Sequence, residues 1–387
     1  MVGIDEPAAD TDLGAMDRYS DADRLALLRL ARTPGLGPAE IGKLLVRHRT
    51  PGGALAALEE LGEAAPRLTR TGDVERERER TAALGGSYLF RGEADYPALL
   101  AEVDHAPWVL ALRGDPAAVH GKLVAMVGAR NASAGGRKLA RDIAQGLAEA
   151  GIGVVSGLAR GIDGAGHEGA LKGGRTVAVI ATGLDVVYPP EHDGLMARIA
   201  EVGAVISERP LGATPTPAQF PRRNRLVSGL SLGVIVVEAA IRSGSLITAR
   251  FAADQSREVM AVPGTPLDER HRGTNQLLRE GAHLIESAAD VQAILAPFAV
   301  AAPPKLASAP RPAVARPAAV PRPTPRLPAA GLGAVLKERL AVEPIAVDEL
   351  IRQCHASPSQ VQQALLELEL AGEIERHPGN RVSLAVL

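Results

Sequence analysis

The densest group of side chains with chemical potential in this 387-residue chain is an arginine run, Phe220-Pro221-Arg222-Arg223-Asn224-Arg225. Three guanidinium groups within four positions repel one another unless anions or acids lie near them. A solvated charged face is the ordinary explanation of such a run. Apolar residues flank this one, however, and guanidinium forks match the geometry of phosphate oxygens. The run therefore predicts phosphate binding by Arg222, Arg223 and Arg225, with Asn224 among them.

A second segment, residues 154–163, reads Val-Val-Ser-Gly-Leu-Ala-Arg-Gly-Ile-Asp. Its small residues Ser156, Gly157 and Gly161 would let a backbone or a phosphate approach closely. A tight turn between a strand and a helix explains the same residues. We expect Asp163 to cap the helix rather than to do chemistry, because helices often begin at Asp.

A third segment places Ser243-Gly244-Ser245 before a predicted helix, with Thr248 in its first turns. Free amides, hydroxyl groups and the positive end of the helix dipole would attract an anion there. Ordinary capping by Ser243 or Ser245 is the alternative, and the two interpretations are compatible.

Patterns for nucleotide and metal sites are weak in this chain. Residues 127–133 lack the third-glycine spacing of a dinucleotide fingerprint, and in the P-loop-like residues 37–43 the next position is Leu44 instead of Ser or Thr. The nine histidines show no metal-ligand spacing, and Cys354 is the single cysteine. We expect no cofactor and no metal.

The composition is that of a globular protein of two or three domains, with 46% hydrophobic and 23% charged residues. Long apolar runs and a basic leader are missing from the sequence, and one cysteine suits a reducing compartment, so we expect a cytoplasmic protein without membrane contact. Because net charge is −2 and aromatic residues make up 2%, a nucleic-acid surface would depend on local arginine clusters and phosphate contacts.

The middle of the chain alternates short apolar runs with helical segments, which predicts an α/β domain with a doubly wound, mainly parallel sheet. In such sheets ligands bind beyond the carboxyl ends of the strands, where the three segments above fall. The expected strands span residues 123–127, 153–156, 176–181, 204–207, 234–238, 258–262 and 283–285.

Smaller units are expected on both sides of this sheet. We divide the chain into a disordered leader (1–20), a helical module resembling a SAM or helix-hairpin-helix domain (21–85), the Rossmann-like domain (86–298), a Pro/Ala-rich basic linker (299–330) and a winged helix-turn-helix (331–387). The last unit has five basic against eight acidic residues, so we expect a regulatory or protein-contact domain. On charge alone, its removal should change DNA affinity less than about threefold.

Taken together, the motifs resemble those of the DNA processing protein A (DprA/Smf) family. They include Val127-Gly-Ala-Arg, the segment 156–163, Gly183-Leu-Asp with Tyr188-Pro189, the arginine run, residues 243–249 and Ala261-Val-Pro-Gly, in order from about Pro97 to Ala293. The resemblance implies a Rossmann-like domain that homodimerises, binds and protects single-stranded DNA in a basic pocket, and loads the RecA recombinase during natural transformation. It implies no catalytic activity.

Carried over by position, the DNA-contacting basic residues of the family fall on Arg130, Lys172 and the arginine run, and we expect Arg130 and Lys172 to share one site. His192 stands where many members have Asn. Two other functions compete with this one. Enzymes of the LOG phosphoribohydrolase type use a Pro-Gly-Gly-x-Gly-Thr-x-x-Glu motif, and its nearest counterpart, residues 263–266, lacks the glycine pair and the glutamate. A transcriptional regulator acting through the winged helix conflicts with the acidic charge of that domain.

Overall fold

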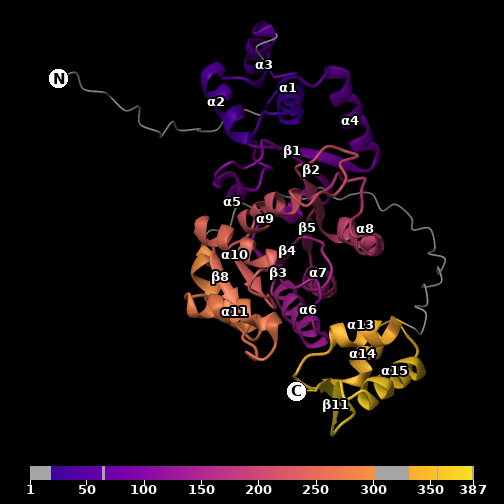
Figure 1. Cartoon of the computed structure of the whole chain (residues 1–387). Helices are drawn as coiled ribbons and strands as arrows, with labels where there is room; N and C mark the ends of the chain where they lie inside the picture. Colours follow the sequence, from indigo (N-terminus) through magenta and orange to yellow (C-terminus); the bar gives the residue numbers. More distant parts are fainter. Residues whose placement is uncertain (1–18, 63–65, 301–330, 355, 386–387) are drawn as a thin grey trace.

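The computed structural model describes residues 19–62, 66–300, 331–354 and 356–385. Its centre is a nine-stranded sheet in the order β1-β2-β6-β5-β4-β3-β7-β8-β9 (Figure 1). Strands β3 to β9 pair in parallel, whereas β2 pairs antiparallel with both β1 and β6. The strands are β1 Gly86–Phe90, β2 Val109–Gly114, β3 Leu123–Val127, β4 Gly153–Ser156, β5 Thr176–Val179, β6 Ala204–Ser207, β7 Gly233–Val236, β8 Glu258–Ala261 and β9 His283–Leu284.

The predicted doubly wound, mainly parallel sheet is confirmed, and helices cover both of its faces. On one face α6 (Ala134–Glu149), α7 (Ile162–Gly173) and α12 (Ala288–Leu295) bury an apolar layer against β3, β4, β7 and β8. On the other face α5 (Ala98–Ala101), α9 (Gln219–Gly229) and α10 (Gly244–Asp254) do the same. The remaining helices of this domain are α8 (Asp193–Val202) and α11 (Glu269–Arg279). Strands buried on both faces explain the continuous apolar runs in the sequence.

Strand order reverses at β3, which pairs with β4 on one side and with β7 on the other. The segments that follow β3 and β7 therefore leave the sheet in different directions and open a crevice between them. This is the point at which open α/β sheets bind their ligands.

The N-terminal module consists of α1 (Asp21–Arg32), α2 (Pro38–His48), α3 (Pro51–Glu60) and α4 (Thr71–Ala83). Trp108 Nε1 donates to the carbonyl of Pro38 at 2.8 Å and joins the module to the sheet domain. The predicted leader ends earlier than expected, because Ser20 caps α1 and the hydroxyl of Tyr19 donates to the carbonyl of Arg91. The rest of the leader, residues 1–18, lies outside the described residues.

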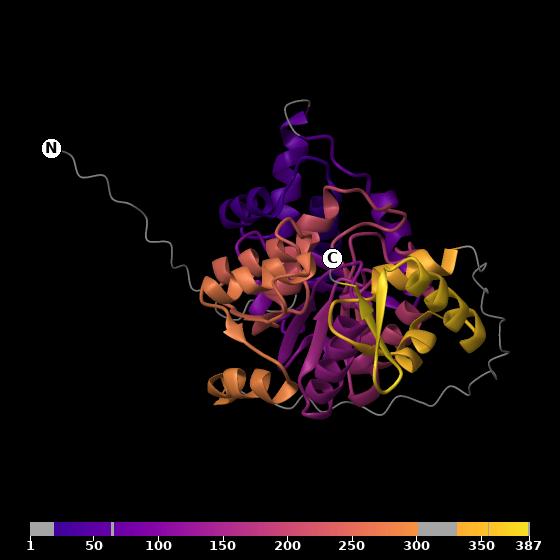
Figure 2. The same ribbon diagram turned by 60° about the horizontal axis from the view of Figure 1, so that its bottom comes forward.

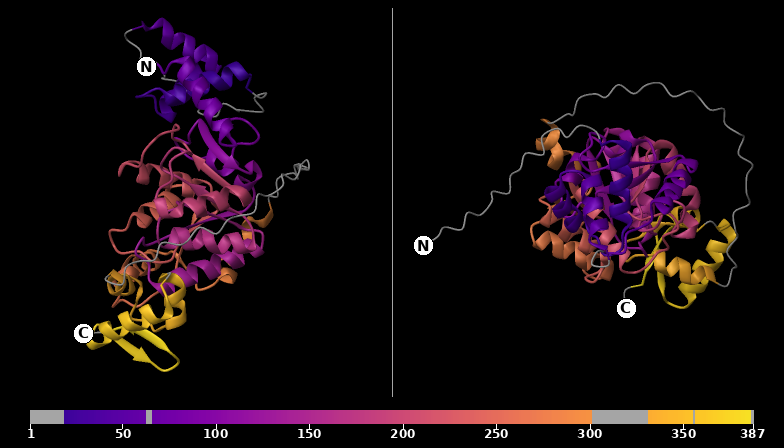
Figure 3. Two further views of the ribbon diagram at one scale, coloured as in Figure 1. Left: turned by 90° about the vertical axis from the view of Figure 1, so that its right-hand side faces the viewer. Right: turned by 90° about the horizontal axis from the view of Figure 1, so that it is seen from above.

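The C-terminal domain is a winged helix, as predicted. It contains α13 (Leu332–Arg339), β10 (Ile345–Ala346), α14 (Val347–Cys354), α15 (Pro358–Leu370), β11 (Ile374–His377) and β12 (Arg381–Leu384). It packs against α6 of the sheet domain (Figure 2) and lies at the opposite end of the molecule from the N-terminal module (Figure 3). Most of the predicted linker, residues 301–330, falls outside the described residues. Within the described ranges, every helix is too short or too polar to span a lipid bilayer.

Candidate nucleic-acid interface

A cavity of about 600 Å³ opens at the carboxyl ends of β3 and β7, where the strand order reverses. Its walls come from the loop between β3 and α6, the turn from β4 into α7, the start of α9, the loop between β7 and α10, the first turns of α10, and the start of α11. All three predicted anion-binding segments thus meet in one place, since residues 154–163 supply Ala159 and Asp163 beside the arginine run and residues 243–248.

Arg130 lies at the rim of this cavity, exposed to solvent on the loop after β3. Its guanidinium stands 5.1 Å from the centre of the Phe220 ring, which is itself 5.6 Å from the ring of Tyr188. Gly161 supports the loop from below: its φ is +77°, and a Cβ there would lie 2.1 Å from the carbonyl oxygen of Ala129. Glycine is required at that position for both reasons.

Arg223 forms the floor of the cavity and is only 5% exposed. Its guanidinium lies over Gly157, where an added Cβ would come within 1.4 Å of Nη1. Burial lowers the pKa of Arg223 to about 10, against the opposing charge of Asp163, so the group stays protonated at neutral pH. Its Nε has no hydrogen-bond partner among the described residues. A buried guanidinium whose hydrogen-bonding capacity is not fully used attracts an anion into the cavity that it lines.

Asp163 supplies the counter-charge beneath Arg223. Its Oδ2 accepts from the amides of Gly157 at 3.0 Å and Ala159 at 3.4 Å, which belong to the turn before α7. The expected helix cap is wrong, because Gly161 is the N-cap residue and Asp163 lies inside the first turn of the helix. Burial raises the pKa of Asp163, while Arg223 and these two amides act in the opposite direction. The carboxylate therefore stabilises the turn through these hydrogen bonds and Arg223 through its charge.

The N-terminal end of α10 forms the opposite wall. Ser243 Oγ accepts from the amide of Ser245 at 3.3 Å and lies 2.5 Å from Ser245 Oγ. Asn224 reaches across from α9 and donates to the carbonyl of Gly244 at 3.4 Å. Thr248 Oγ1 is buried and has no partner among the described residues. Hydroxyl groups at a helix N-terminus, facing a buried arginine, can bind a phosphate.

Several residues expected at this site lie elsewhere. The arginine run is part of α9, so successive side chains point about 100° apart instead of forming one row. Arg223 alone of the three lines the cavity; Arg222 is exposed beside it, and Arg225 pairs with Glu208 at 2.5 Å. Their expected common role as phosphate ligands stays a prediction, and only Arg223 of the three lines this cavity.

Lys172 is also displaced from its expected position. It occupies the last turn of α7, about 15 Å along the helix axis from Ile162, whose amide bonds the loop after β3. It therefore lies toward the amino-terminal edge of the strands, away from Arg130. Ser156 lies below the cavity with its hydroxyl donating to the carbonyl of Met126 at 2.6 Å, a structural contact.

Three polar residues that line the cavity were not predicted as site residues: Asn131, Arg242 and Arg270. Arg242 directly precedes the Ser-Gly-Ser segment, so its place in the sequence could have identified it as a site residue. Arg270 belongs to no motif and reaches the cavity only through the fold. Within the described ranges, no group of three His, Cys, Asp or Glu residues is arranged to hold a metal ion.

Three family models match the chain: DNA recombination-mediator protein A over residues 87–296, the DprA winged helix domain over 317–380, and the DprA-like N-terminal HHH domain over 21–80. Protein Smf of Synechocystis sp. is 35% identical over 314 residues, covering 76% of this chain and 79% of the relative. DNA processing protein DprA of Streptococcus pneumoniae is 45% identical over 199 residues, covering 51% and 70%.

Two solved structures resemble the chain. The crystal structure of DprA from Streptococcus pneumoniae matches with a TM-score of 0.61 and 34% identity, over 71% of this chain and 98% of that one. DNA processing protein A from Helicobacter pylori, described for its single-stranded DNA binding mode, matches with a TM-score of 0.51 and 29% identity, over 55% and 96%.

Proposed function

Because the chain belongs to the DNA recombination-mediator protein A (DprA/Smf) family, we propose that it binds single-stranded DNA in the cavity between β3 and β7. The observation that carries the proposal is Arg223, a buried and protonated guanidinium that lines the cavity. A phosphate there would gain charge-assisted hydrogen bonds and would supply the second anion that this arginine lacks.

The recessed position of Arg223 favours a single strand over a duplex. A flexible strand can turn one phosphate into a cavity of about 600 Å³, whereas the phosphates of a stiff duplex lie on a convex surface. Arg130 and the rings of Phe220 and Tyr188 stand where the neighbouring nucleotides would pass. Base stacking on aromatic rings is a common, sequence-tolerant contribution to single-strand binding. The Helicobacter pylori relative is described as binding single-stranded DNA, which supports the same role.

The proposal extends to a role in DNA processing rather than catalysis. The cavity lining contains no His, Cys or Lys, and its one acid, Asp163, accepts hydrogen bonds from two amides. No acid–base pair is therefore available to activate a nucleophile. In line with the family resemblance, we propose that the protein acts in the cytoplasm as a homodimer, protects incoming single strands and loads RecA onto them.

A transcriptional regulator remains the weaker alternative. The helix that a winged helix would place in the major groove, α15, carries three Gln and two Glu residues and no Lys or Arg. It has no cation to neutralise a duplex phosphate.

Fluorescence anisotropy with a labelled oligo(dT) and a duplex of equal length, at two salt concentrations, tests the proposal. We expect tighter binding of the single strand. Arg130→Ala should weaken it and reduce the salt slope by roughly 0.7. Lys122→Ala removes a charge at the other end of β3 and should leave binding unchanged. Equal or tighter duplex binding would reject the proposal, as would equal effects of the two substitutions.

A further inference from the structure

Arg270 contacts two parts of the molecule, the cavity of the sheet domain and the winged helix. It stands in the first turn of α11 and lines the cavity described above. Its guanidinium also reaches the winged helix, where it donates to the carbonyl of Glu338 at 3.0 Å and to the carbonyl of Leu340 at 2.6 Å. One side chain thus connects the proposed DNA site with the C-terminal domain.

The donors of Arg270 are nearly all occupied in this arrangement. Asp268 accepts from Nε and Nη2 on one side of the guanidinium, at 3.0 Å and 2.7 Å. At the other edge of the guanidinium, the carbonyl of Glu338 accepts from Nη1 and the carbonyl of Leu340 accepts from Nη2. Of the five N–H groups of an arginine, the described residues thus engage four, which leaves one for any ligand in the cavity. A bidentate contact with a phosphate needs two.

The carbonyls that occupy Arg270 lie at the C-terminal end of α13. The last carbonyls of a helix have no partner inside the helix and carry the negative end of its dipole. Arg270 therefore caps α13 with the same pair of N–H groups that would bind two phosphate oxygens. The C-terminus of α13 and a DNA phosphate therefore offer this arginine the same kind of partner, a pair of negatively polarised or charged oxygen acceptors.

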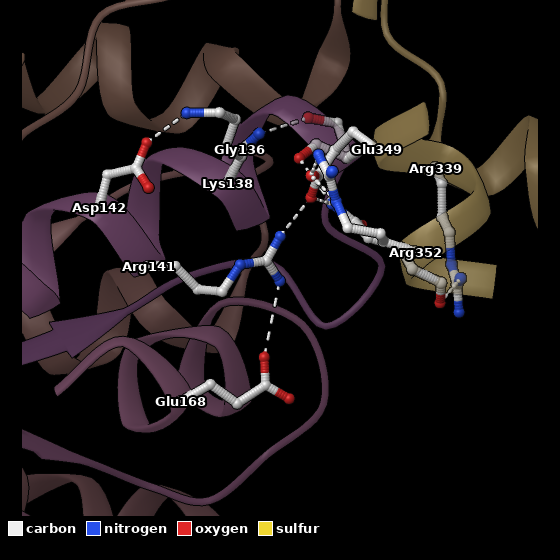
Figure 4. A network of polar contacts seen from close by, with 11 residues as sticks. Gly136, Lys138, Arg141, Asp142, Glu168, Arg339, Glu349 and Arg352 are labelled. Carbon is white, nitrogen blue, oxygen red and sulfur yellow. Dashed lines mark hydrogen bonds and ion pairs between the residues drawn. The ribbon is translucent and has the colours of Figure 1, made fainter. Parts of the chain in front are cut away.

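A second set of contacts, between the sheet domain and α14, holds the winged helix in this position (Figure 4). Arg141 of α6 lies between Glu349 of α14, at 2.5 Å, and Glu168 of α7, at 3.5 Å. Gln353 Nε2 donates to the carbonyl of Ala134 at 3.2 Å, and Ala134 packs into the apolar core of the winged helix. These contacts can be changed without altering a residue that lines the cavity.

We propose that the docked winged helix lowers the affinity of the cavity for single-stranded DNA by occupying Arg270, and that a bound strand and the docked domain compete for this residue. The proposal rests on the proposed function. The net charge of the winged helix predicted that its removal would change DNA affinity less than about threefold. A larger change is now expected, because the domain occupies one arginine of the DNA site. By linkage, docking should weaken DNA binding as much as DNA binding weakens docking.

The test uses the full chain with Glu349→Arg, which places two cations face to face at Arg141 and opposes docking. Oligo(dT) affinity should rise at least about fivefold, the lower range of typical coupling between sites. The charge swap Arg141→Glu with Glu349→Arg restores an ion pair and should return the affinity toward that of the unaltered chain. In an Arg270→Ala background, Glu349→Arg should have no further effect.

Hydrogen exchange of the backbone amides of residues 332–340 measures docking independently. Oligo(dT) should accelerate this exchange in the unaltered chain. The proposal is overturned if bound oligo(dT) leaves the exchange unchanged, or if Glu349→Arg accelerates exchange without tightening binding. Failure of the proposed function looks different, since the unaltered chain and every variant would then bind oligo(dT) with no measurable affinity.

Discussion

Replacing Gly157 by alanine should disable the cavity without removing any charge. The added Cβ would lie 1.4 Å from Nη1 and 2.3 Å from Cζ of Arg223, so the guanidinium must move. The backbone of Gly157 does not have the positive φ that alanine avoids, so the strain falls on the arginine. A charge-assisted hydrogen bond contributes about 2 kcal/mol, and its loss corresponds to roughly thirtyfold weaker binding.

The assay is anisotropy of labelled oligo(dT) with Gly157→Ala, compared with Gly194→Ala. Gly194 lies on α8 and has open space where a Cβ would stand, so its substitution should leave binding unchanged. Thermal melting of both variants establishes that they are folded. If folded Gly157→Ala binds within about twofold of the unaltered chain, Arg223 does not contact the strand from this position and the reasoning is refuted.

Three further predictions concern charges in and around the sheet domain. Asp163→Asn leaves Arg223 buried without its counter-charge and should lower the free energy of unfolding in urea by about 3 kcal/mol. Burial lowers the pKa of His167 from 6.5 to about 3, so the unfolded chain takes up a proton between these values and stability is lost as pH falls below 6.5. Urea unfolding at pH 7 and pH 5 should differ by about 2 kcal/mol more than in His167→Gln. Lys172→Ala and Arg225→Ala should each keep oligo(dT) affinity within about threefold, because neither residue lines the cavity; a tenfold loss in either would restore the wider site expected from the sequence.

The sheet was predictable because it depends on local patterns, and the cavity lies at the sheet edge where the sequence predicted a ligand. Apolar runs of four or five residues between helices indicate parallel strands, and ligands bind at their carboxyl ends. The antiparallel pair β1 and β2 was missed. Its residues Gly86–Phe90 and Val109–Gly114 follow no βαβ pattern and join the sheet through long-range pairing with β6.

The residues that line the cavity differ in part from those that the sequence singled out. The run Arg222-Arg223-Asn224-Arg225 is one cluster in sequence, but helix α9 directs its side chains to different sides. Arg225 forms an ion pair with Glu208. Lys172 lies in the last turn of α7, at the end of the helix that is remote from the cavity. Arg270 has no sequence signal at all, since its role comes from tertiary contacts with the cavity and with α13.

Photo-crosslinking of an oligo(dT) that carries 5-bromouracil, followed by mass spectrometry of the full-length protein, tests the location of DNA binding most directly. We predict crosslinked peptides from residues 128–131, 219–224 and 242–248, with Phe220 and Arg130 among the modified residues, and loss of these crosslinks in Gly157→Ala. Crosslinks confined to the winged helix, residues 331–385, or to the N-terminal module, residues 21–83, would contradict single-stranded DNA binding in this cavity.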